Sequence, residues 1–559
     1  MAASLCHLST GYCVRLASVA TSSKFWGSHL LKKSGSLYRA KHTNRDSKIQ
    51  LLSRAMFKDA SDLIAVNPSK LHYGVCVSDI DGDGKMEFFV CGFGSENQVL
   101  KWTGERLVNI ASGTPLEDSE RRAIGVAAGD LNGDGAEEIY VLNTDTFLGR
   151  KKLTDRLFSK SGGSWVDLFS LPMNMDEANM CAGRSVCSVD RMGTGRYGFF
   201  VANYGGKMKL FEISESGFLE DRASEAGLAT YPTGGRALVS LPLVSHHSMD
   251  IFAGNEGGPN FLFCHKGTET GQYAECAAAY GLTDSMENCR GIAVVDIIGT
   301  ESFGLACGNW QGPHRLFVPS GPGPIGGATA LGFSDAESAS GGFKDVASAE
   351  MAKPSPIRTV IAADFDNDGF EELFFNNIGR NNTLFRQCSA GCWVEADIGD
   401  ALETNGLGTG AAVADIDNDG CLELLIAHGE TRPQPLSFFK PMKNSNSWMR
   451  VMPLTKQGAP ARGASVRLTD ETGRTQKRVI DAGSGYLCCM EPIAHFGLGQ
   501  LHGPVDLRQY LPDIPLKGLQ VLISLKDLRK RLQYASMSVG IHKMIPTQVS
   551  AFSNQISSL

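Results

Sequence analysis

The sequence has no apolar run long enough to cross a membrane as a helix. A spanning helix needs about 20 consecutive apolar residues. Although 42% of the 559 residues are hydrophobic, they are spread along the chain. The longest apolar stretches, such as residues 237–244 and 519–525, have the length of buried strands. The sequence therefore predicts a soluble or secreted protein without a transmembrane segment.

Signatures of common catalytic sites are also missing. There is no G-x-S-x-G elbow of a hydrolase and no H-E-x-x-H motif of a zinc protease. None of the 15 cysteines forms a C-x-x-C pair or joins histidines at zinc spacing. Two interpretations of the cysteines stay open: buried single thiols, or disulfides such as Cys388 with Cys392, and Cys488 or Cys489 with a distant partner. The missing motifs argue against an enzyme.

Acidic residues are scarce in the N-terminal segment. Residues 1–58 carry ten Lys or Arg and one acid, Asp46, which leaves a formal net charge of −16 on the rest of the chain. We interpret the basic, Ser-rich residues 1–55 as a targeting or disordered leader, either secretory or mitochondrial. The acidic remainder argues against nucleic acid as a partner, because phosphate binding requires a basic face.

What the sequence does contain is an internal repeat, in a chain with 64 glycines. A short apolar strand, a loop, a second apolar strand and a Gly/Asn turn recur seven times, with loops that begin at residues 79, 130, 190, 242, 296, 364 and 415. Further strands follow in several copies, as at 257–263 and 218–224. Three or four strands per unit at this spacing are typical of propeller blades. We predict an all-β fold, with a seven-bladed β-propeller over residues 56–442.

A segment before the first blade matches the fourth strand of other units. Phe57–Ser61 (FKDAS) is similar to Phe343–Ser348 (FKDVAS) but precedes the first loop. We predict that it pairs with the last blade and closes the ring, which removes exposed sheet edges. The alternative is an open stack of β units.

Four of the seven loops follow the pattern D-x-[DN]-x-D-G-x-x-E, which offers only oxygen ligands. Side chains at positions 1, 3, 5 and 9, with the backbone carbonyl at position 7, suit Ca²⁺, whereas zinc and copper prefer softer ligands. We expect about four structural calcium ions; the alternative is a turn held only by its own hydrogen bonds. The predicted ligand sets are Asp79, Asp81, Asp83, Lys85 and Glu87; Asp130, Asn132, Asp134, Ala136 and Glu138; Asp364, Asp366, Asp368, Phe370 and Glu372; and Asp415, Asp417, Asp419, Cys421 and Glu423.

These loops are not EF-hands, although they begin in the same way. An EF-hand needs a Glu at position 12 and flanking helices. Position 12 here lies inside an apolar run and is occupied by Val90, Val141, Phe375 or Ile426. The sequence therefore predicts strand–loop–strand calcium hairpins.

The other three loops have the same strand–loop–strand pattern as the repeat but lack most of its acidic residues. Position 1 is Asp190, Pro242 or Asp296, and position 3 is Met192, Val244 or Ile298. We expect these three loops to bind no ion.

The acidic hairpins resemble the FG-GAP/VCBS repeats of integrin α-chain propellers. From about residue 56 to 499 the chain resembles the cartilage acidic protein 1 family, on stretches that include Lys70–Gly84, Cys181–Tyr204 and Gly308–Phe317. Residues 446–451, 462–468 and 481–499 are similar to the UnbV/ASPIC domain, which we place at residues 443–515 as a small β domain. Its His495 and Glu491 have no nucleophile or metal partner in the sequence and are interpreted as structural.

The chain departs from the family near its C-terminal end. Longer relatives end in a calcium-binding EGF-like module, whereas no cysteine follows Cys489 here. Residues 516–559, which include Leu525–Gly540, are predicted to be a divergent tail that is helical or disordered.

The resemblance implies a non-enzymatic, calcium-binding extracellular matrix or cell-surface recognition protein. Its propeller would bind an extracellular protein or glycan through the loops between blades. A glycosylation sequon, Asn381-Asn382-Thr383, is compatible with secretion. The alternatives are a hydrolase that uses the channel of the propeller, and an intracellular scaffold if the leader is not secretory.

Overall fold

The structure, a computed structural model, describes residues 54–523 apart from 246–247, 299–302, 321–341, 390–391, 502–504 and 511–515. The predicted leader thus lies almost wholly outside the described residues. The described part of the chain is nearly all β, with one four-residue α-helix, α2 (Ala277–Tyr280). Within it, no helix is long and apolar enough to span a membrane. Short 3-10 helices are η1 (Ser61–Leu63), η2 (Pro115–Glu117), η3 (Leu168–Ser170), η4 (Met175–Glu177) and η5 (Asp400–Leu402).

Strand pairing divides most of the chain into antiparallel units of four strands, in which each strand pairs with the next. The first unit consists of β2 (His72–Ser78), β3 (Glu87–Gly92), β4 (Gln98–Trp102) and β5 (Leu107–Asn109). The second consists of β6 (Ala123–Gly129), β7 (Glu138–Asn143), β8 (Arg156–Ser161) and β9 (Ser164–Asp167). The third consists of β10 (Gly183–Val189), β11 (Gly198–Gly206), β12 (Lys209–Ile213) and β13 (Leu219–Asp221).

The same order continues along the chain. The fourth unit consists of β14 (Thr233–Leu241), β15 (Asp250–Asn255), β16 (Phe261–His265) and β17 (Tyr273–Glu275). The fifth consists of β18 (Cys289–Asp296), β19 (Phe303–Asn309), β20 (Arg315–Ser320) and β21 (Gly342–Asp345). The sixth consists of β22 (Ile357–Ala363), β23 (Glu372–Asn377), β24 (Thr383–Ser389) and β25 (Cys392–Glu395). The last consists of β26 (Gly408–Ala414), β27 (Glu423–His428), β28 (Ser437–Pro441) and β1 (Phe57–Asp59).

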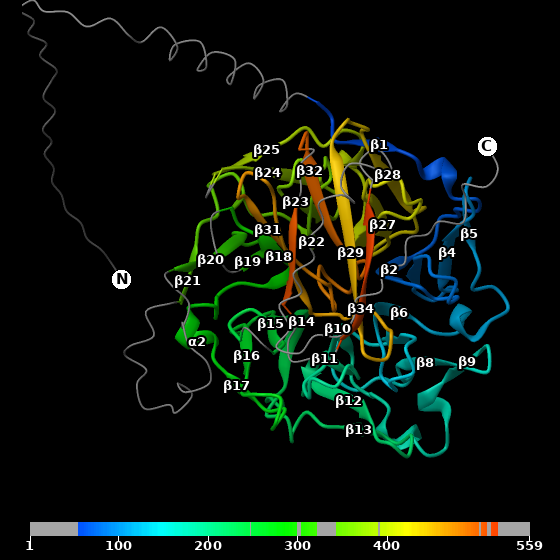
Figure 1. The fold of residues 1–559 in the computed structure, drawn as a ribbon. Coiled ribbons are helices and arrows are strands. Elements are labelled where there is room, and N and C mark those ends of the chain that lie inside the picture. The colour runs from blue at the N-terminus through cyan, green and yellow to red at the C-terminus, as the bar shows by residue number, and fades with distance from the viewer. Residues whose placement is uncertain are drawn as a thin grey trace, which may run out of the picture. The chain divides into compact units, whose positions relative to one another are not determined.

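The first strands of successive units contact one another around a common centre (Figure 1). The contacts run from β2 through β6, β10, β14, β18 and β22 to β26, and β26 contacts β2 again. The predicted nearly all-β, propeller-like fold is confirmed. The blade count stays a prediction, because β11 also pairs with β14 and joins the third and fourth units in one sheet.

The strand β1 completes the last unit, as the sequence predicts. It pairs antiparallel with β28, with Phe57 opposite Pro441 and Asp59 opposite Phe439. Phe57 is buried, and its ring centroid lies 4.8 Å from that of Phe365. This pairing of the start of the described chain with the last unit contradicts an open stack of units.

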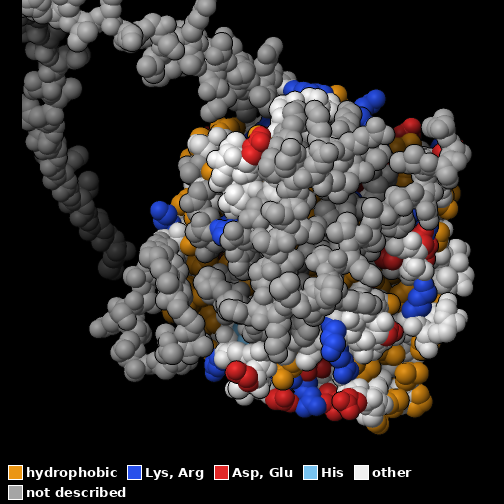
Figure 2. All heavy atoms as spheres, viewed as in Figure 1, with side chains coloured by type: hydrophobic (Ala, Val, Ile, Leu, Met, Phe, Trp, Pro, Cys, Tyr) orange, Lys and Arg blue, Asp and Glu red, His pale blue; other side chains and the backbone are white. Residues whose placement is uncertain are grey.

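Burial decreases from the first strand of a unit to the fourth. Every residue of β6 and β7 is buried, whereas β5 and β13 bury only their first residue. Strands covered on both faces read as continuous apolar runs rather than alternating ones. On the face drawn in Figure 2, acidic and basic side chains lie side by side along the lower edge, where Figure 1 places β12 and β13.

A second module follows the ring and forms two three-stranded sheets. One sheet has the order β32-β29-β34 and the other β31-β30-β33. Its core includes Val451, Val466, Leu468, Ile480 and Phe496. The strands are β29 (Ser447–Thr455), β30 (Ser465–Thr469), β31 (Thr475–Val479), β32 (Ala494–Gly499), β33 (Asp506–Tyr510) and β34 (Leu516–Ile523).

The prediction for the tail is wrong at its beginning. Residues 516–523 form the strand β34, which pairs with β29 from Met449 opposite Ile523 to Thr455 opposite Leu516. This strand includes most of the apolar run 519–525, and pairing with β29 determines its structure, since local propensity is a weak prior. Residues 524–559, with the helical-looking stretch 525–540, lie outside the described residues. The domain boundaries themselves remain predictions.

The loop between β31 and β32 enters the centre of the ring. Its backbone forms hydrogen bonds with the first strands of five units. Gly485 exchanges two bonds with Ile292, and Cys489 bonds with both Val75 and Val77. The other three bonds join Ala482 O to Ser188 N, Leu487 O to Val126 N, and Glu491 N to Val413 O. Two glycines permit this fit: Gly483 and Gly485 have φ of +123° and +64°, and added Cβ atoms would lie 2.7 Å from Cys187 Cβ and 2.8 Å from Thr359 Cγ2. We call residues 481–491 the channel loop.

Candidate metal centres

The four acidic loops occupy one place in the fold. Each joins the first strand of a unit to the second: β2 to β3, β6 to β7, β22 to β23 and β26 to β27. The glutamate at position 9 is the first residue of the second strand in every case, as Glu87 is in β3 and Glu372 in β23. Position 12 lies in the same strand, so strands and not helices flank the loops.

Backbone amides hold the carboxylates of each loop in the same way. In the sixth unit, Asp364 Oδ2 accepts from Gly369 N at 2.9 Å, and Asp368 Oδ1 accepts from Phe370 N at 2.9 Å. Glu372 Oε2 accepts from Phe365 N at 3.0 Å. The equivalent bonds recur in the other three loops. Backbone amides of the loop itself therefore contribute to the position of the carboxylates in all four loops.

Two residues in each loop adopt positive φ, which turns the chain around the cage. The glycine at position 6 has φ between +84° and +93° in all four loops, from Gly420 to Gly135. Position 4 is Gly in the first two loops and Asn in the others, where Asn367 has φ +59° and Asn418 +60°. Gly and Asn are the residues that reach this region most easily.

Carboxylate oxygens converge at the centre of three loops. The oxygens of positions 1, 3 and 9 lie within 4.8 Å of one another in the loops that begin at residues 79, 364 and 415. Asp364 Oδ1 and Asp415 Oδ1 are buried and have no hydrogen-bond partner among the described residues. The second loop has Asn132 at position 3, whose amide donates to Glu138 Oε1 at 2.6 Å. A hard divalent cation fits such oxygen sets, so these clusters can bind a metal ion.

Burial raises the pKa of these carboxyl groups. The pKa of Glu87 and of Glu138 rises to about 7, and that of Asp415 also to about 7. The pKa of Asp130 rises to about 6. Burial is the main cause, and neighbouring carboxylates add to it in each case. A bound cation would lower these pKa values, because its charge favours the ionised carboxylates.

The residue opposite the position-9 glutamate, on the third strand of the unit, differs among the loops. In three units it is a cation: Lys101 Nζ lies 3.4 Å from Glu87 Oε1, Arg386 Nε lies 3.4 Å from Glu372 Oε1, and Lys440 Nζ lies 2.9 Å from Glu423 Oε1. In the second unit it is Ser159, whose hydroxyl donates to Glu138 Oε1 at 2.9 Å. In three loops, a basic side chain thus lies where it would compete with a bound metal ion.

We expect this cross-strand residue to tune calcium affinity. Lys101→Ser should raise the affinity of the first loop by roughly fivefold, because a partly exposed ion pair is worth up to about 1 kcal/mol. Ser159→Lys should lower the affinity of the second loop by a similar factor. Calorimetric calcium titration of the full chain measures both. Lys207→Ser, at an exposed lysine outside the loops, controls for net charge, and equal affinities in all variants would contradict the expectation.

Two of the three weak loops have an acid at position 1, and this acid accepts hydrogen bonds from backbone amides. Asp190 accepts from Gly195 N at 2.6 Å and Thr194 N at 3.1 Å. Asp296 accepts from Lys477 N at 2.8 Å and lies 3.5 Å from Arg478 Nη1. The expectation that these loops bind no ion remains a prediction.

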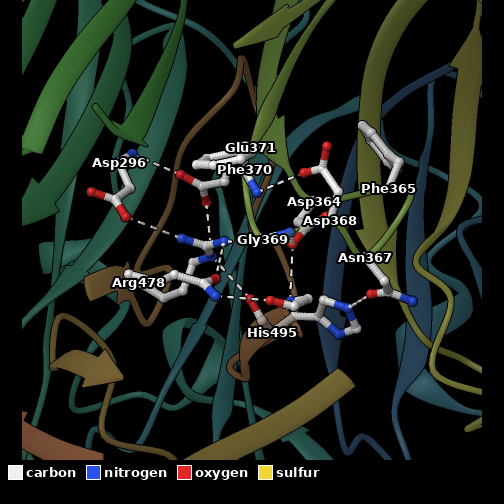
Figure 3. Close-up of polar contacts among 12 residues, drawn as sticks. Asp296, Asp364, Phe365, Asn367, Asp368, Gly369, Phe370, Glu371, Arg478 and His495 are labelled. Carbon is white, nitrogen blue, oxygen red and sulfur yellow. Dashed lines mark hydrogen bonds and ion pairs between the residues drawn. The ribbon is translucent and has the colours of Figure 1, made fainter. Parts of the chain in front are cut away.

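Three buried arginines of the second module reach the acidic loops of the ring. Arg450 Nη1 lies 3.1 Å from Asp415 Oδ2, and Arg462 Nη2 lies 3.0 Å from Glu137 Oε2. Arg478 lies among Asp296, Glu371 and Asp364, with Nε 3.4 Å from Glu371 Oε1 (Figure 3). The module therefore covers the second, sixth and seventh loops.

His495 and Glu491 belong to this interface, which agrees with a structural role. His495 Nε2 lies 2.6 Å from Asn367 Oδ1, as Figure 3 shows, and burial holds its pKa well below the usual value. Glu491 forms an ion pair with Arg450 and accepts from Asp415 N at 3.3 Å.

Sequence reasoning missed the acids at position 8 that anchor the module. Glu137 and Glu371 are buried and meet Arg462 and Arg478. Only the second and sixth loops have an acid at position 8. The Glu-Glu pairs 137–138 and 371–372 were therefore the sequence feature that could have indicated an additional role for these two loops. The predicted position-7 residues Lys85, Ala136, Phe370 and Cys421 lie in their loops and donate backbone amides to position 5.

Comparisons with known proteins agree with this architecture. The model of the FG-GAP-like repeat matches residues 79–141 and 364–426, and the model described as ASPIC and UnbV matches residues 454–515. Cartilage acidic protein 1 of Xenopus tropicalis is 43% identical over 485 residues, which are 80% of this chain and 72% of the relative. The human and mouse proteins of the same name are each 43% identical over 467 residues, 78% of this chain and 68% and 69% of theirs. The chain therefore belongs to the cartilage acidic protein 1 family.

Proposed function

We propose that the protein is a calcium-loaded extracellular recognition scaffold of the matrix or cell surface, without catalytic activity. The observation that carries the proposal is the set of acidic loops, in three of which carboxylate oxygens converge within 4.8 Å of one another and include buried oxygens without a hydrogen-bond partner among the described residues. About four ions would be held by the predicted ligand sets. Each ion would tie the first two strands of a unit together, and in three of the loops also the covering module.

The channel loop weighs against the alternative of a hydrolase. Residues 481–491 fill the centre of the ring through backbone hydrogen bonds to five first strands. His495 and Glu491, the residues nearest to acid–base chemistry in the sequence, are held by Asn367 and Arg450. The exposed turns and loops of the units remain as the surface for an extracellular protein or glycan.

The extracellular assignment rests on the family and on the sequon. The name of the relatives contains the word cartilage, a tissue rich in extracellular matrix. Asn381 is exposed in the turn between β23 and β24, while Asn382 and Thr383 begin the next strand region. Oligosaccharyltransferase can therefore reach this side chain in a secreted chain.

Secretion is tested by expressing the full chain with a C-terminal tag in mammalian cells. We expect the tagged protein in the medium, with a mass that falls by one glycan after glycosidase treatment. Asn381→Gln should have the lower mass from the start, and Asn444→Gln, at an exposed asparagine outside a sequon, should not. Retention of an unglycosylated chain in the cytosol or in mitochondria would favour the intracellular scaffold instead.

A further inference from the structure

Four arginines lie at the end of the ring where the first strands begin, opposite the end at which those strands lead into the loops to the second strands. They are Arg184 in β10, Arg236 in β14, Arg290 in β18 and Arg358 in β22. Each lies within a register shift between the first and second strands of its unit. Such irregularities re-aim a side chain that would otherwise follow the alternation of the sheet. We call these residues the arginine mouth.

The arginine mouth surrounds Tyr486, near the middle of the channel loop. Arg236 Nη1 donates to Tyr486 Oη at 3.4 Å, and the guanidinium of Arg358 lies 6.0 Å from the centre of the tyrosine ring. Burial opposes ionisation of Tyr486, yet the four guanidinium groups outweigh it and lower the pKa of the phenol to about 8. The channel loop therefore brings an acceptor to the centre of the cluster.

Positive charge in the arginine mouth exceeds the charge of its carboxylates. Glu256 pairs with Arg236 and with Arg290 at 2.9 Å, and Glu430 lies 2.9 Å from Arg358 Nη2. Arg184 has no carboxylate partner among the described residues and donates to the carbonyls of Gly183 and Phe147. Four guanidinium groups thus face two carboxylates.

The four side chains are nearly inaccessible to water, which makes this imbalance costly. Their exposed fractions are only 3% to 7%. Arg290 Nε and Arg358 Nη1 are buried and have no hydrogen-bond partner in the described part of the chain. Buried charge and unpaired donors each raise the free energy of the folded state unless an anion compensates them.

Aromatic residues form the rim, and a cavity opens beside it. Tyr204 stacks on Arg236 at 4.2 Å, and Trp310 stacks on Arg358 at 4.2 Å. Tyr204 and Glu256 also line a cavity of about 320 Å³ whose other walls include Tyr231 and Phe261. A cavity of this size is at the lower end of the range for small-ligand sites. Guanidinium groups beside aromatic faces suit a ligand with an acidic group on a flat body.

We propose that the arginine mouth binds an oxyanion group, a sulfate or carboxylate, of a small acidic ligand or an acidic glycan. The planar guanidinium fork matches such groups with two parallel hydrogen bonds. The unpartnered donors of Arg290 and Arg358, and the guanidinium of Arg184, supply the charge and hydrogen bonds. The inference goes beyond the proposed function, because it names the chemistry of a ligand and a place for it, and it does not depend on calcium.

The first experiment measures thermal unfolding of the full chain while sulfate replaces chloride at constant ionic strength. Sulfate should raise the unfolding midpoint by a few degrees through mass action on the folded state. Arg184→Gln should lose at least half of this rise; it is chosen because it leaves no carboxylate unpaired. Arg222→Gln, at an exposed arginine that pairs with Glu220 and Glu225 outside the mouth, should keep the full rise. Equal midpoints in sulfate and chloride would overturn the proposal.

A second readout does not depend on the folding of a variant. An oxyanion among the four arginines should raise the pKa of Tyr486, which the near-ultraviolet absorbance of tyrosinate reports. Tyr486→Phe assigns the titration, and burial raises the pKa of Tyr73, another phenol close to Tyr486, above its usual value. A Tyr486 titration that sulfate does not move would contradict binding at this place.

The last arm distinguishes the two sources of the oxyanion. A sulfated disaccharide is titrated against the wild-type chain and Arg184→Gln by calorimetry. Binding of the disaccharide at least tenfold tighter than inorganic sulfate identifies an acidic glycan. Equal or weaker binding identifies a free small anion, and loss of neither ligand on Arg184→Gln would overturn the proposal.

Discussion

Chelation of calcium is expected to lower the unfolding midpoint of the folded chain more than any single substitution. A site saturated at one hundred times its dissociation constant adds about 2.7 kcal/mol of stability, and four such loops add roughly 10 kcal/mol. The loops lie between the first two strands of their units, and three of them also contact the second module. Loss of the ions should therefore loosen both parts together.

The effect should depend on pH in a defined direction. In the chain without calcium, the pKa of Glu87, Glu138 and Asp415 is about 7, against about 4 in an unfolded chain. Between these values the folded chain holds protons that calcium must displace. The difference between the midpoints with calcium and with EDTA should be small at pH 5 and large at pH 7.5.

Differential scanning calorimetry in calcium and in EDTA, at pH 5, 6 and 7.5, measures this difference. Burial lowers the pKa of His72 and His314 to about 4. Both histidines are present in the calcium sample and in the EDTA sample. Their effect on the unfolding midpoint therefore cancels when the two midpoints are subtracted. A difference of zero, or one that does not change with pH, would refute a structural role for calcium at these carboxylates.

Arg462→Ala is expected to destabilise the protein by about 3–5 kcal/mol, because it leaves a buried carboxylate without its partner. Arg462 is fully buried and donates to Glu137 Oε2 at 3.0 Å, to Asp481 O at 2.8 Å and to Val77 O at 3.0 Å. It therefore joins the second module, the channel loop and the first strand of the ring. Urea unfolding of the calcium-loaded chain measures the loss.

Two variants separate the buried ion pair from a general effect of removing an arginine. Arg462→Met with Glu137→Leu removes both charges and should recover most of the stability, since an apolar pair of similar volume often replaces a buried ion pair. Arg474→Ala removes a partly exposed arginine that stacks on Phe370 at 4.5 Å, and should cost about 1 kcal/mol or less. A loss as large for Arg474→Ala as for Arg462→Ala would rule out the buried pair as the cause.

Sequence reasoning succeeded where the relevant interactions are local. The turn of each acidic loop depends on hydrogen bonds between a carboxylate and backbone amides a few residues away, as from Gly369 N to Asp364. The closing strand at Phe57–Asp59 was also predictable, because it repeats the motif of other fourth strands and lacks a first strand of its own. Both signals are patterns that a repeat displays several times.

The same reasoning failed where the partner is distant in the chain. Residues 516–523 form a strand that pairs with β29. The apolar run 519–525 has the length of a strand, but no local pattern reveals that β29 is its partner. The roles of Glu137 and Glu371 depend on Arg462 and Arg478, which follow 325 and 107 residues later. The cations opposite the position-9 glutamates depend on the register between the second and third strands, which the pattern within either strand does not define.

By itself, the sequence determined the repeat, the oxygen-only loops and the nearly all-β class, because these are encoded in short stretches that recur. Only the tertiary structure decided what occupies the centre of the ring, which loops the second module covers, and where four arginines from separate units meet. Those arrangements arise from contacts between segments that lie far apart in the sequence. The free energy of burying charge and of filling the channel depends on how these segments pack together, and the sequence of any one segment does not contain that information.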